Sequence, residues 1–255
     1  MAMNAPVFPR PIAHRGLHNR NSGIIENSRS AFEAAVERGF AIECDLQLSA
    51  DDEPVLFHDQ FTERLTGLPG RIRDMTAAEI TKTPLLDSTT GDCPQRLTDF
   101  LEQINGRVLL QIELKRQDDE AETRTLAKAT AEALGSYAGP VTVESFDPDL
   151  IRLIREFGFS GPRGIITYDY EQHDPHGPTL SDGQRFILRN LLHWSESRFD
   201  FISCAKDALD LPAMVFWRAL GVPVTAWTVR SAAEAAAASA GSGQIVFEGF
   251  DPEPA

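Results

Sequence analysis

Cysteine is scarce, and the cysteines are poorly spaced for disulfide bonds. Only three occur among 255 residues, at positions 44, 93 and 204. An odd, low number without close spacing is not a disulfide framework and fits a reducing compartment. The N-terminal segment also lacks the apolar stretch of a secretory signal. We therefore expect a cytoplasmic protein.

Long apolar runs and positive charge are also lacking. No run approaches the roughly 18 apolar residues of a membrane-spanning helix, so stable membrane insertion is not expected. Aspartate and glutamate number 38 against 24 lysines and arginines, a formal net charge of −14. Such a chain repels nucleic acid and anionic membranes. An anionic substrate would need a local cation or arginines to bind.

Three common active-site motifs are absent from the sequence: the Walker loop, the G-x-S-x-G nucleophile elbow and the G-x-G-x-x-G fingerprint. Their absence argues against nucleotide binding and serine hydrolysis. The chemistry is therefore expected from the charged residues that end several short apolar runs.

Short apolar segments alternate with segments of helical periodicity. The predicted parallel strands lie at 11–13, 41–46, 107–114, 141–143, 164–167, 199–203, 222–227 and 245–247, and the predicted helices at 28–38, 121–134, 148–157, 184–195, 208–220 and 232–240. This alternation is typical of βα units. Eight such strands close a (β/α)₈ TIM barrel, an α/β fold. An open doubly wound sheet is the alternative.

A further apolar run at 55–57 breaks the alternation. Eight residues separate it from Leu46, whereas a parallel crossover needs about a dozen or more. We therefore expect an antiparallel partner or an excursion, with an insertion after strand two at about 51–96. The whole chain, 1–255, is expected to form one TIM-barrel domain. The polar loop at 168–178, with two histidines, is interpreted as solvated, and a metal-binding or substrate-covering loop is the alternative.

Three carboxylates form a predicted metal site. Glu43 and Asp45 are two apart in a predicted strand, so they point to the same side. Two carboxylates held that close repel unless a cation or a proton lies between them. Glu113 ends another strand and adds a third carboxylate. Such oxygens suit Mg²⁺ or Ca²⁺.

Basic and aromatic residues lie at the same strand ends, which converge on the active site of a TIM barrel. Arg15 offers a planar fork that matches phosphate oxygens. Lys115 shares a face with Glu113 and either neutralises a carboxylate in a salt bridge or holds an anionic oxygen. The Trp227 ring either lies against the carbon skeleton of a substrate or packs in the core.

His14 and His58 are the predicted acid–base pair. Near neutral pH one histidine can accept a proton while the other donates one. His14 ends the first predicted strand, and His58 follows the excursion. Asp59 is expected to orient His58 or its loop, and a distant metal ligand is the alternative.

These motifs resemble the glycerophosphodiester phosphodiesterase family, in its bacterial, cytosolic type. The resemblance rests on IAHRG at 12–16, ENSRSAF at 26–32, IECDL at 42–46, EPVLFHD at 53–59, RLTGLPGRIRDMTAAEI at 64–80, IELK at 112–115, SFDPDLI at 145–151 and AWTV at 226–229. It implies a TIM barrel with a small insertion after strand two and one divalent cation, Mg²⁺ or Ca²⁺. It also implies hydrolysis of glycerophosphodiesters to sn-glycerol 3-phosphate and an alcohol.

The resemblance also implies roles for single residues. By position, the catalytic pair is His14 and His58, the metal ligands are Glu43, Asp45 and Glu113, the phosphate-contacting residues are Arg15 and Lys115, and Trp227 lies on the glycerol side. Glu26 matches a glutamate near the site. The nucleophile is either the glycerol 2-hydroxyl, which gives a cyclic phosphate, or water.

Three departures from the family pattern surround the expected substrate mouth. Glu248 stands where an aspartate is expected, Arg230 replaces an asparagine, and the loop at 17–25 differs from the usual short form. They bear on the leaving group more than on the chemistry. The alternatives are a phosphodiesterase for lysophospholipids or sugar phosphodiesters, and a non-catalytic phosphate-binding barrel that would be favoured by loss of a histidine or a carboxylate. The expected partner is a small-molecule substrate, and a homo-oligomer is compatible with the sequence.

Overall fold

A computed structural model describes residues 5–171 and 180–253. Most of the polar loop at 168–178, including both of its histidines, lies outside the described residues, and so does its predicted role. Among the described residues, no helix combines the length and the apolar character needed to cross a membrane.

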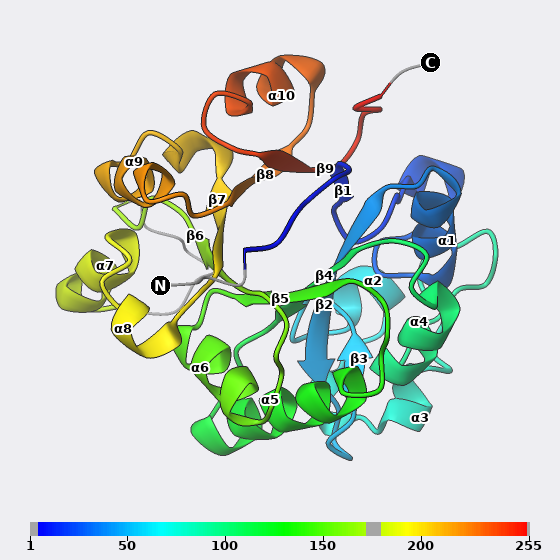
Figure 1. Cartoon of the computed structure of the whole chain (residues 1–255). Helices are drawn as coiled ribbons and strands as arrows, with labels where there is room; N and C mark the ends of the chain where they lie inside the picture. Colours follow the sequence, from blue (N-terminus) through cyan, green and yellow to red (C-terminus); the bar gives the residue numbers. More distant parts are fainter. Residues whose placement is uncertain (1–4, 172–179, 254–255) are drawn as a thin grey trace.

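Parallel strands close into a barrel that helices surround (Figure 1). The barrel strands are β1 (Ile12–Ala13), β2 (Ala41–Leu48), β4 (Leu110–Leu114), β5 (Val141–Ser145), β6 (Arg163–Thr167), β7 (Phe201–Ala205), β8 (Val224–Val229) and β9 (Gln244–Phe247). β1 pairs with both β2 and β9, which closes the sheet. The predicted TIM barrel is confirmed, and the open sheet was the wrong alternative.

The short strand β3 (Pro54–Leu56) is the antiparallel neighbour of β2, with Leu56 opposite Leu46. This confirms the prediction of an antiparallel partner. The chain then forms α2 (Glu63–Thr66), η2 (Ile72–Asp74) and α3 (Ala77–Ile80) before α4 (Leu97–Ile104) leads to β4. This excursion, at about 51–96, buries an apolar cluster separate from the barrel core. The cluster also includes one residue from the loop before α1, and its members are Ile25, Val55, Phe57, Leu65, Ile72, Ala77, Ile80 and Leu85. That separate cluster holds the turn that carries His58 against the barrel.

The remaining helices follow the predicted order, with two differences in their bounds. They are α1 (Arg29–Glu37), α5 (Glu120–Leu134), α6 (Pro148–Glu156), α7 (Asp182–Arg189), α8 (Trp194–Ser197), α9 (Pro212–Ala219) and α10 (Ala232–Ala238), with short turns η1 (Arg20–Ser22) and η3 (Lys206–Ala208). The single helix predicted at 184–195 was wrong, because Leu191 has a φ of 54° that interrupts it. The helix predicted from 208 begins at Pro212, since proline favours the first helical turn.

The alternation of side chains along β2 positions the site. Ile42, Cys44 and Leu46 belong to the main apolar cluster, together with side chains of the surrounding helices such as Phe32. Because successive side chains of a strand point to opposite faces, the residues between them face the barrel interior. Glu43 and Asp45 are therefore buried inside the barrel by the same pattern that builds its wall.

Candidate active site

Three carboxylates converge inside the barrel. In the β2–β4 register Asp45 lies opposite Glu113, and Glu43 lies two residues earlier on β2. The candidate ligand oxygens of Glu43, Asp45 and Glu113 lie within 4.8 Å of one another, and all three residues are buried. The structure thus brings together the side chains predicted as metal ligands.

Two cations lie against these carboxylates. Lys115 Nζ is 2.8 Å from Asp45 Oδ1 and 2.7 Å from Glu113 Oε1. The backbone N–H of Arg15 donates to Glu43 Oε2 at 2.9 Å, and Arg15 Nε lies 3.4 Å from Asp45 Oδ2. Lys115 therefore forms the salt bridge that was one of its two alternatives, and its contact with an anionic oxygen stays a prediction.

Burial and neighbouring charges shift the pKa values of the three carboxyl groups in different directions. Burial raises the pKa of Glu43 well above its usual value, and the charges of Asp45 and Glu113 add to the effect. Burial also raises the pKa of Glu113, although Lys115 opposes it. At Asp45 burial is outweighed by Lys115, His58 and Arg15, which hold its pKa well below the usual value. Three buried oxygen ligands that lack a full counter-charge fit a hard divalent cation.

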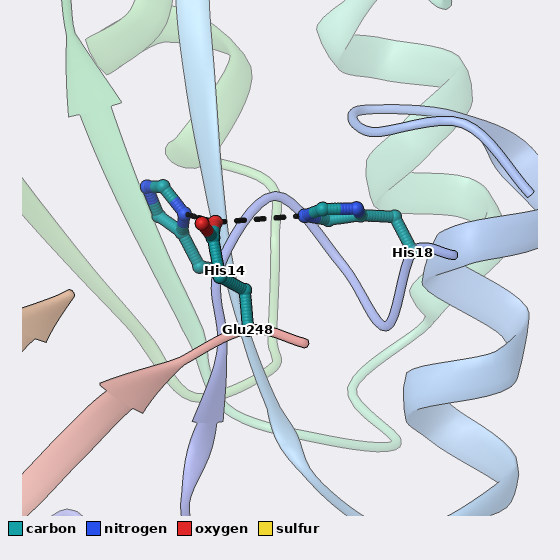
Figure 2. Close-up of side chains that lie close together, drawn as sticks. All are labelled: His14, His18 and Glu248. Atoms are coloured by element: carbon teal, nitrogen blue, oxygen red, sulfur yellow. Dashed lines mark hydrogen bonds and ion pairs between the residues drawn. The ribbon is translucent and has the colours of Figure 1, made fainter. Parts of the chain in front are cut away.

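His14 is fixed by Glu248, as Figure 2 shows. Its Nδ1 lies 2.5 Å from Glu248 Oε2, and its Nε2 lies 3.9 Å from Glu43 Oε2. Arg230 Nε donates to the other oxygen of Glu248 at 2.8 Å. Burial lowers the pKa of His14, against the hydrogen bond with Glu248. The Glu248 carboxylate at Nδ1 favours the tautomer with the proton on Nδ1. The unprotonated Nε2 then faces Glu43.

His14, His18 and Glu248 also form a second set of side chains whose ligand atoms lie within 4.8 Å (Figure 2). The 2.5 Å separation of His14 Nδ1 and Glu248 Oε2 is a hydrogen-bond distance. Two ligands that share one zinc ion at about 2 Å each lie roughly 3 Å apart. We therefore interpret Glu248 as the hydrogen-bond partner of His14.

His58 is held in a matching way on the excursion. Its Nδ1 lies 2.7 Å from Asp59 Oδ1, as expected for an orienting carboxylate. The backbone carbonyl of His58 accepts a hydrogen bond from Gln47 Nε2 on β2 at 2.9 Å. Each predicted acid–base histidine therefore has a carboxylate at Nδ1.

Trp227 lies within an aromatic group and not against the carboxylates. Its Nε1–H donates to the carbonyl of Ser203 at 3.0 Å, and its ring meets Phe146 edge-on with centroids 5.6 Å apart. Phe146 in turn contacts Tyr168, with centroids 6.1 Å apart. Phe146 and Tyr168 directly follow β5 and β6, so the aromatic side chains and the three carboxylates come from different strands of one barrel end.

Sequence reasoning missed several residues of the site. Asn27 Nδ2 donates to Asp45 Oδ2 at 2.8 Å, and Arg64 Nη1 donates to Glu26 Oε2 at 2.8 Å. Glu144 on β5 lies opposite Glu113, and burial raises its pKa to about 8. The alternation along β5 was the signal available for Glu144. Asn27 and Arg64 lie within the ENSRSAF and RLTGLPGRIRDMTAAEI motifs, but no spacing rule indicated their contacts.

A family model described as the glycerophosphoryl diester phosphodiesterase family matches residues 14–241. The chain belongs to this family. It is therefore a phosphodiesterase, which confirms the predicted family and enzyme class.

Individual relatives agree with this assignment. Glycerophosphodiester phosphodiesterase 1 of Bos taurus is 28% identical over 241 residues, 86% of this chain and 71% of the relative. An Oleispira antarctica phosphodiesterase, solved in complex with the product sn-glycerol-3-phosphate, has a TM-score of 0.75 at 21% identity and covers 94% of this chain and 93% of its own. A Thermotoga maritima glycerophosphodiester phosphodiesterase has a TM-score of 0.69 at 22% identity, covering 95% and 96%. These two structures support the fold.

Proposed function

We propose that this protein hydrolyses glycerophosphodiesters to sn-glycerol 3-phosphate and an alcohol, with one divalent cation, Mg²⁺ or Ca²⁺. One arrangement carries the proposal. The buried carboxylates Glu43, Asp45 and Glu113 lie beside His14, and the carboxylate of Asp59 holds His58. The product bound to the Oleispira relative supports the choice of substrate.

The acidic residues would bind the cation, and the basic residues would bind or balance negative charge. Glu43, Asp45 and Glu113 would hold the cation, which as a Lewis acid would offset negative charge on the phosphate oxygens. Arg15 Nε is a buried donor without a hydrogen-bond partner among the described residues, so it can donate to a non-bridging phosphate oxygen. Lys115 stays charged, since Asp45 and Glu113 raise its pKa against the effect of burial.

The two histidines transfer the protons. Because burial lowers its pKa, His14 is neutral at pH 7 and suits the base that takes the proton of the nucleophile. His58, oriented by Asp59, then donates a proton to the leaving alkoxide. The nucleophile is the glycerol 2-hydroxyl or water, and detection of a cyclic phosphate intermediate distinguishes them.

Product formation tests the proposal directly. Purified protein with glycerophosphocholine and Mg²⁺ or Ca²⁺ should release sn-glycerol 3-phosphate, measured by an enzyme-coupled assay. EDTA should abolish the reaction, and activity that survives exhaustive chelation would contradict the metal assignment. His14→Ala and His58→Ala should each lower kcat by about 10²–10⁴-fold. Near-normal rates in both variants would remove the histidines from the mechanism.

Activity on lysophospholipids is a second candidate, favoured by apolar side chains on the excursion that carries His58. Phe61, Leu68 and Leu86 are 56%, 58% and 44% exposed. Exposed apolar side chains beside a site can contact an acyl chain. A higher kcat/KM for lysophosphatidylcholine than for glycerophosphocholine, reduced by Phe61→Ser for the lipid alone, would favour this candidate. Equal values would remove it.

A further inference from the structure

Arg64, on α2 of the excursion, is bound by two carboxylates at once. Its Nη1 and Nη2 donate to the two oxygens of Glu26, each at 2.8 Å. Its Nε donates to Asp59 Oδ2 at 2.5 Å, and Nη2 also reaches Asp59 Oδ1 at 3.2 Å. Every nitrogen of the guanidinium therefore already has a carboxylate partner.

Both partners of Arg64 contact residues of the proposed mechanism. Glu26 Oε1 accepts a hydrogen bond from Arg15 Nη1 at 2.7 Å. Asp59 Oδ1 lies 2.7 Å from His58 Nδ1. The contacts run without a break through Arg15, Glu26, Arg64, Asp59 and His58. They join the loop after β1 to the excursion after β3.

The alternating charges of these residues make the contacts mutually supportive. Arg64 and Arg15 hold the pKa of Glu26 at about 2, against the effect of burial. His58 and Arg64 likewise keep the pKa of Asp59 below its usual value, although burial opposes them. Bidentate arginine–carboxylate pairs fix both distance and orientation. A lysine could not reproduce this geometry, because its ammonium is a single point charge.

We infer that Arg64 is a positioning residue, which sets Arg15 through Glu26 and His58 through Asp59 and so couples phosphate binding to proton transfer. The inference rests on the proposed function, in which Arg15 binds the phosphate and His58 donates the proton. It also gives the excursion a role in catalysis, since α2 supplies the residue that hydrogen-bonds both the Glu26 and the Asp59 side chains.

The split between KM and kcat tests the coupling. Glu26→Gln should mainly raise KM, because Arg15 loses its anchor, and Asp59→Asn should mainly lower kcat, because His58 loses its orientation. Arg64→Ala should do both, with a loss in kcat of about 10–100-fold, as is typical for residues that orient catalytic groups. Arg64→Lys should recover little of either. Changes in one parameter alone would overturn the coupling.

A matched control is available at Arg107. Its Nη1 and Nη2 donate to Glu33 Oε1 and Oε2 at 2.7 and 2.9 Å, and its side chain is 42% exposed against 43% for Arg64. Arg107→Ala removes a bidentate arginine–carboxylate pair that joins α1 to the segment before β4, at the barrel end opposite the site. It should leave kcat and KM unchanged. If it lowers activity as much as Arg64→Ala, the loss is structural and the inference fails.

Two further measurements separate positioning from general damage. In the Asp59→Asn background, Arg64→Ala should lower kcat no further, since the route to His58 is already broken. Fully multiplicative losses would contradict that route. Added guanidinium ion should restore part of the activity of Arg64→Ala and leave Asp59→Asn unchanged. Absence of rescue in a variant that melts like the wild type would also count against the inference.

A readout independent of activity distinguishes failure of this inference from failure of the proposed function. The ¹⁵N signals of the His58 imidazole report on the hydrogen bond at Nδ1, whether or not glycerophosphodiesters are the substrate. They should change in Arg64→Ala and in the milder Arg64→Gln, and stay constant in Arg107→Ala. Unchanged His58 signals in folded Arg64 variants overturn the inference. An inactive wild type with the expected shifts overturns only the function.

Discussion

At the scale of single residues, Lys115 supplies positive charge to two of the three buried carboxylates. It binds both Asp45 and Glu113, and its side chain is largely buried. Removing one partner of a buried ion pair costs about 3–5 kcal/mol, because a charge is left uncompensated. Without added cation, Lys115→Met should therefore lower the free energy of unfolding by that amount. Urea unfolding in EDTA measures it, and Mg²⁺ or Ca²⁺ should recover part of the loss.

Lys128 provides the control for Lys115. It lies on α5 with its side chain 60% exposed, 3.8 Å from Glu132. Exposed pairs of this kind contribute about 0–1 kcal/mol. Lys128→Met should therefore unfold like the wild type, with or without cation. Equal losses in the two variants would show that Lys115 does not balance the carboxylates.

Glu144 predicts a pH dependence of stability. Burial raises its folded pKa to about 8 from an ordinary 4.5, so the folded state binds the proton more tightly than the unfolded state. Its contribution is therefore fully present below about pH 4.5 and is lost as the pH rises towards 8. Relative to the wild type, Glu144→Gln should gain stability between pH 4.5 and 8.5. Urea unfolding in EDTA checks this, and parallel curves for the two proteins would refute it.

The residues of the site differ in how far sequence could predict them. Glu43, Asp45 and Glu113 lie in strands, where the two-residue period fixes which side chains share a face, so their convergence followed from spacing alone. Arg64 could not be found in this way. Its partners Glu26 and Asp59 lie in two loops, and the contact depends on how the excursion folds back, which no local period encodes.

At the scale of elements, the junction between β1 and α1 places His14 and Arg15, and Gly16 is the point where it packs against the backbone of α1. Gly16 has a φ of +80°, and a Cβ there would lie 2.9 Å from the backbone carbon and the Cβ of Ala31 on α1. Gly16→Ala should therefore cost more than the roughly 1–2 kcal/mol of a left-handed backbone alone. It should also lower kcat/KM, since α1 and the loop that carries His14 and Arg15 must move apart.

Gly39 separates the two effects of this substitution. It has a φ of +66°, and a Cβ there would meet nothing within 4 Å. Gly39→Ala should show only the backbone penalty and keep full activity. Thermal unfolding and steady-state kinetics of both variants measure the difference. Equal losses in stability would mean that contact with Ala31 is unimportant.

Elements were predictable where a single physical rule dominated. The eight residues between Leu46 and Val55 exclude a parallel crossover, and β3 is antiparallel as expected. The predicted helix at 184–195 failed because an apolar periodicity continues past Arg189, while the backbone turns at Leu191. Leucine rarely adopts a positive φ, so its sequence gives no warning of the break.

At the scale of the whole molecule, the net charge of −14 repels an anionic substrate, whereas the local cations of the site would attract it. In the proposed mechanism Arg15 and Lys115 attract a phosphodiester once it is within the barrel mouth, but the remaining surface repels an anion at longer range. Salt screens the long-range part first, since the Debye length falls from about 30 Å at 0.01 M to about 8 Å at 0.15 M ionic strength. Buried pairs such as Lys115–Asp45 are screened far less.

Substrate charge therefore decides the salt dependence. Glycerophosphoglycerol carries a net negative charge, whereas the choline group of glycerophosphocholine cancels the charge of its phosphate. Raising the ionic strength from 0.01 to 0.15 M at a fixed saturating concentration of the divalent cation should increase kcat/KM several-fold for glycerophosphoglycerol and change it little for glycerophosphocholine. Steady-state kinetics on both substrates, with an inert monovalent salt, measure this. A fall in kcat/KM for glycerophosphoglycerol would instead show that Arg15 and Lys115 dominate the field even outside the barrel.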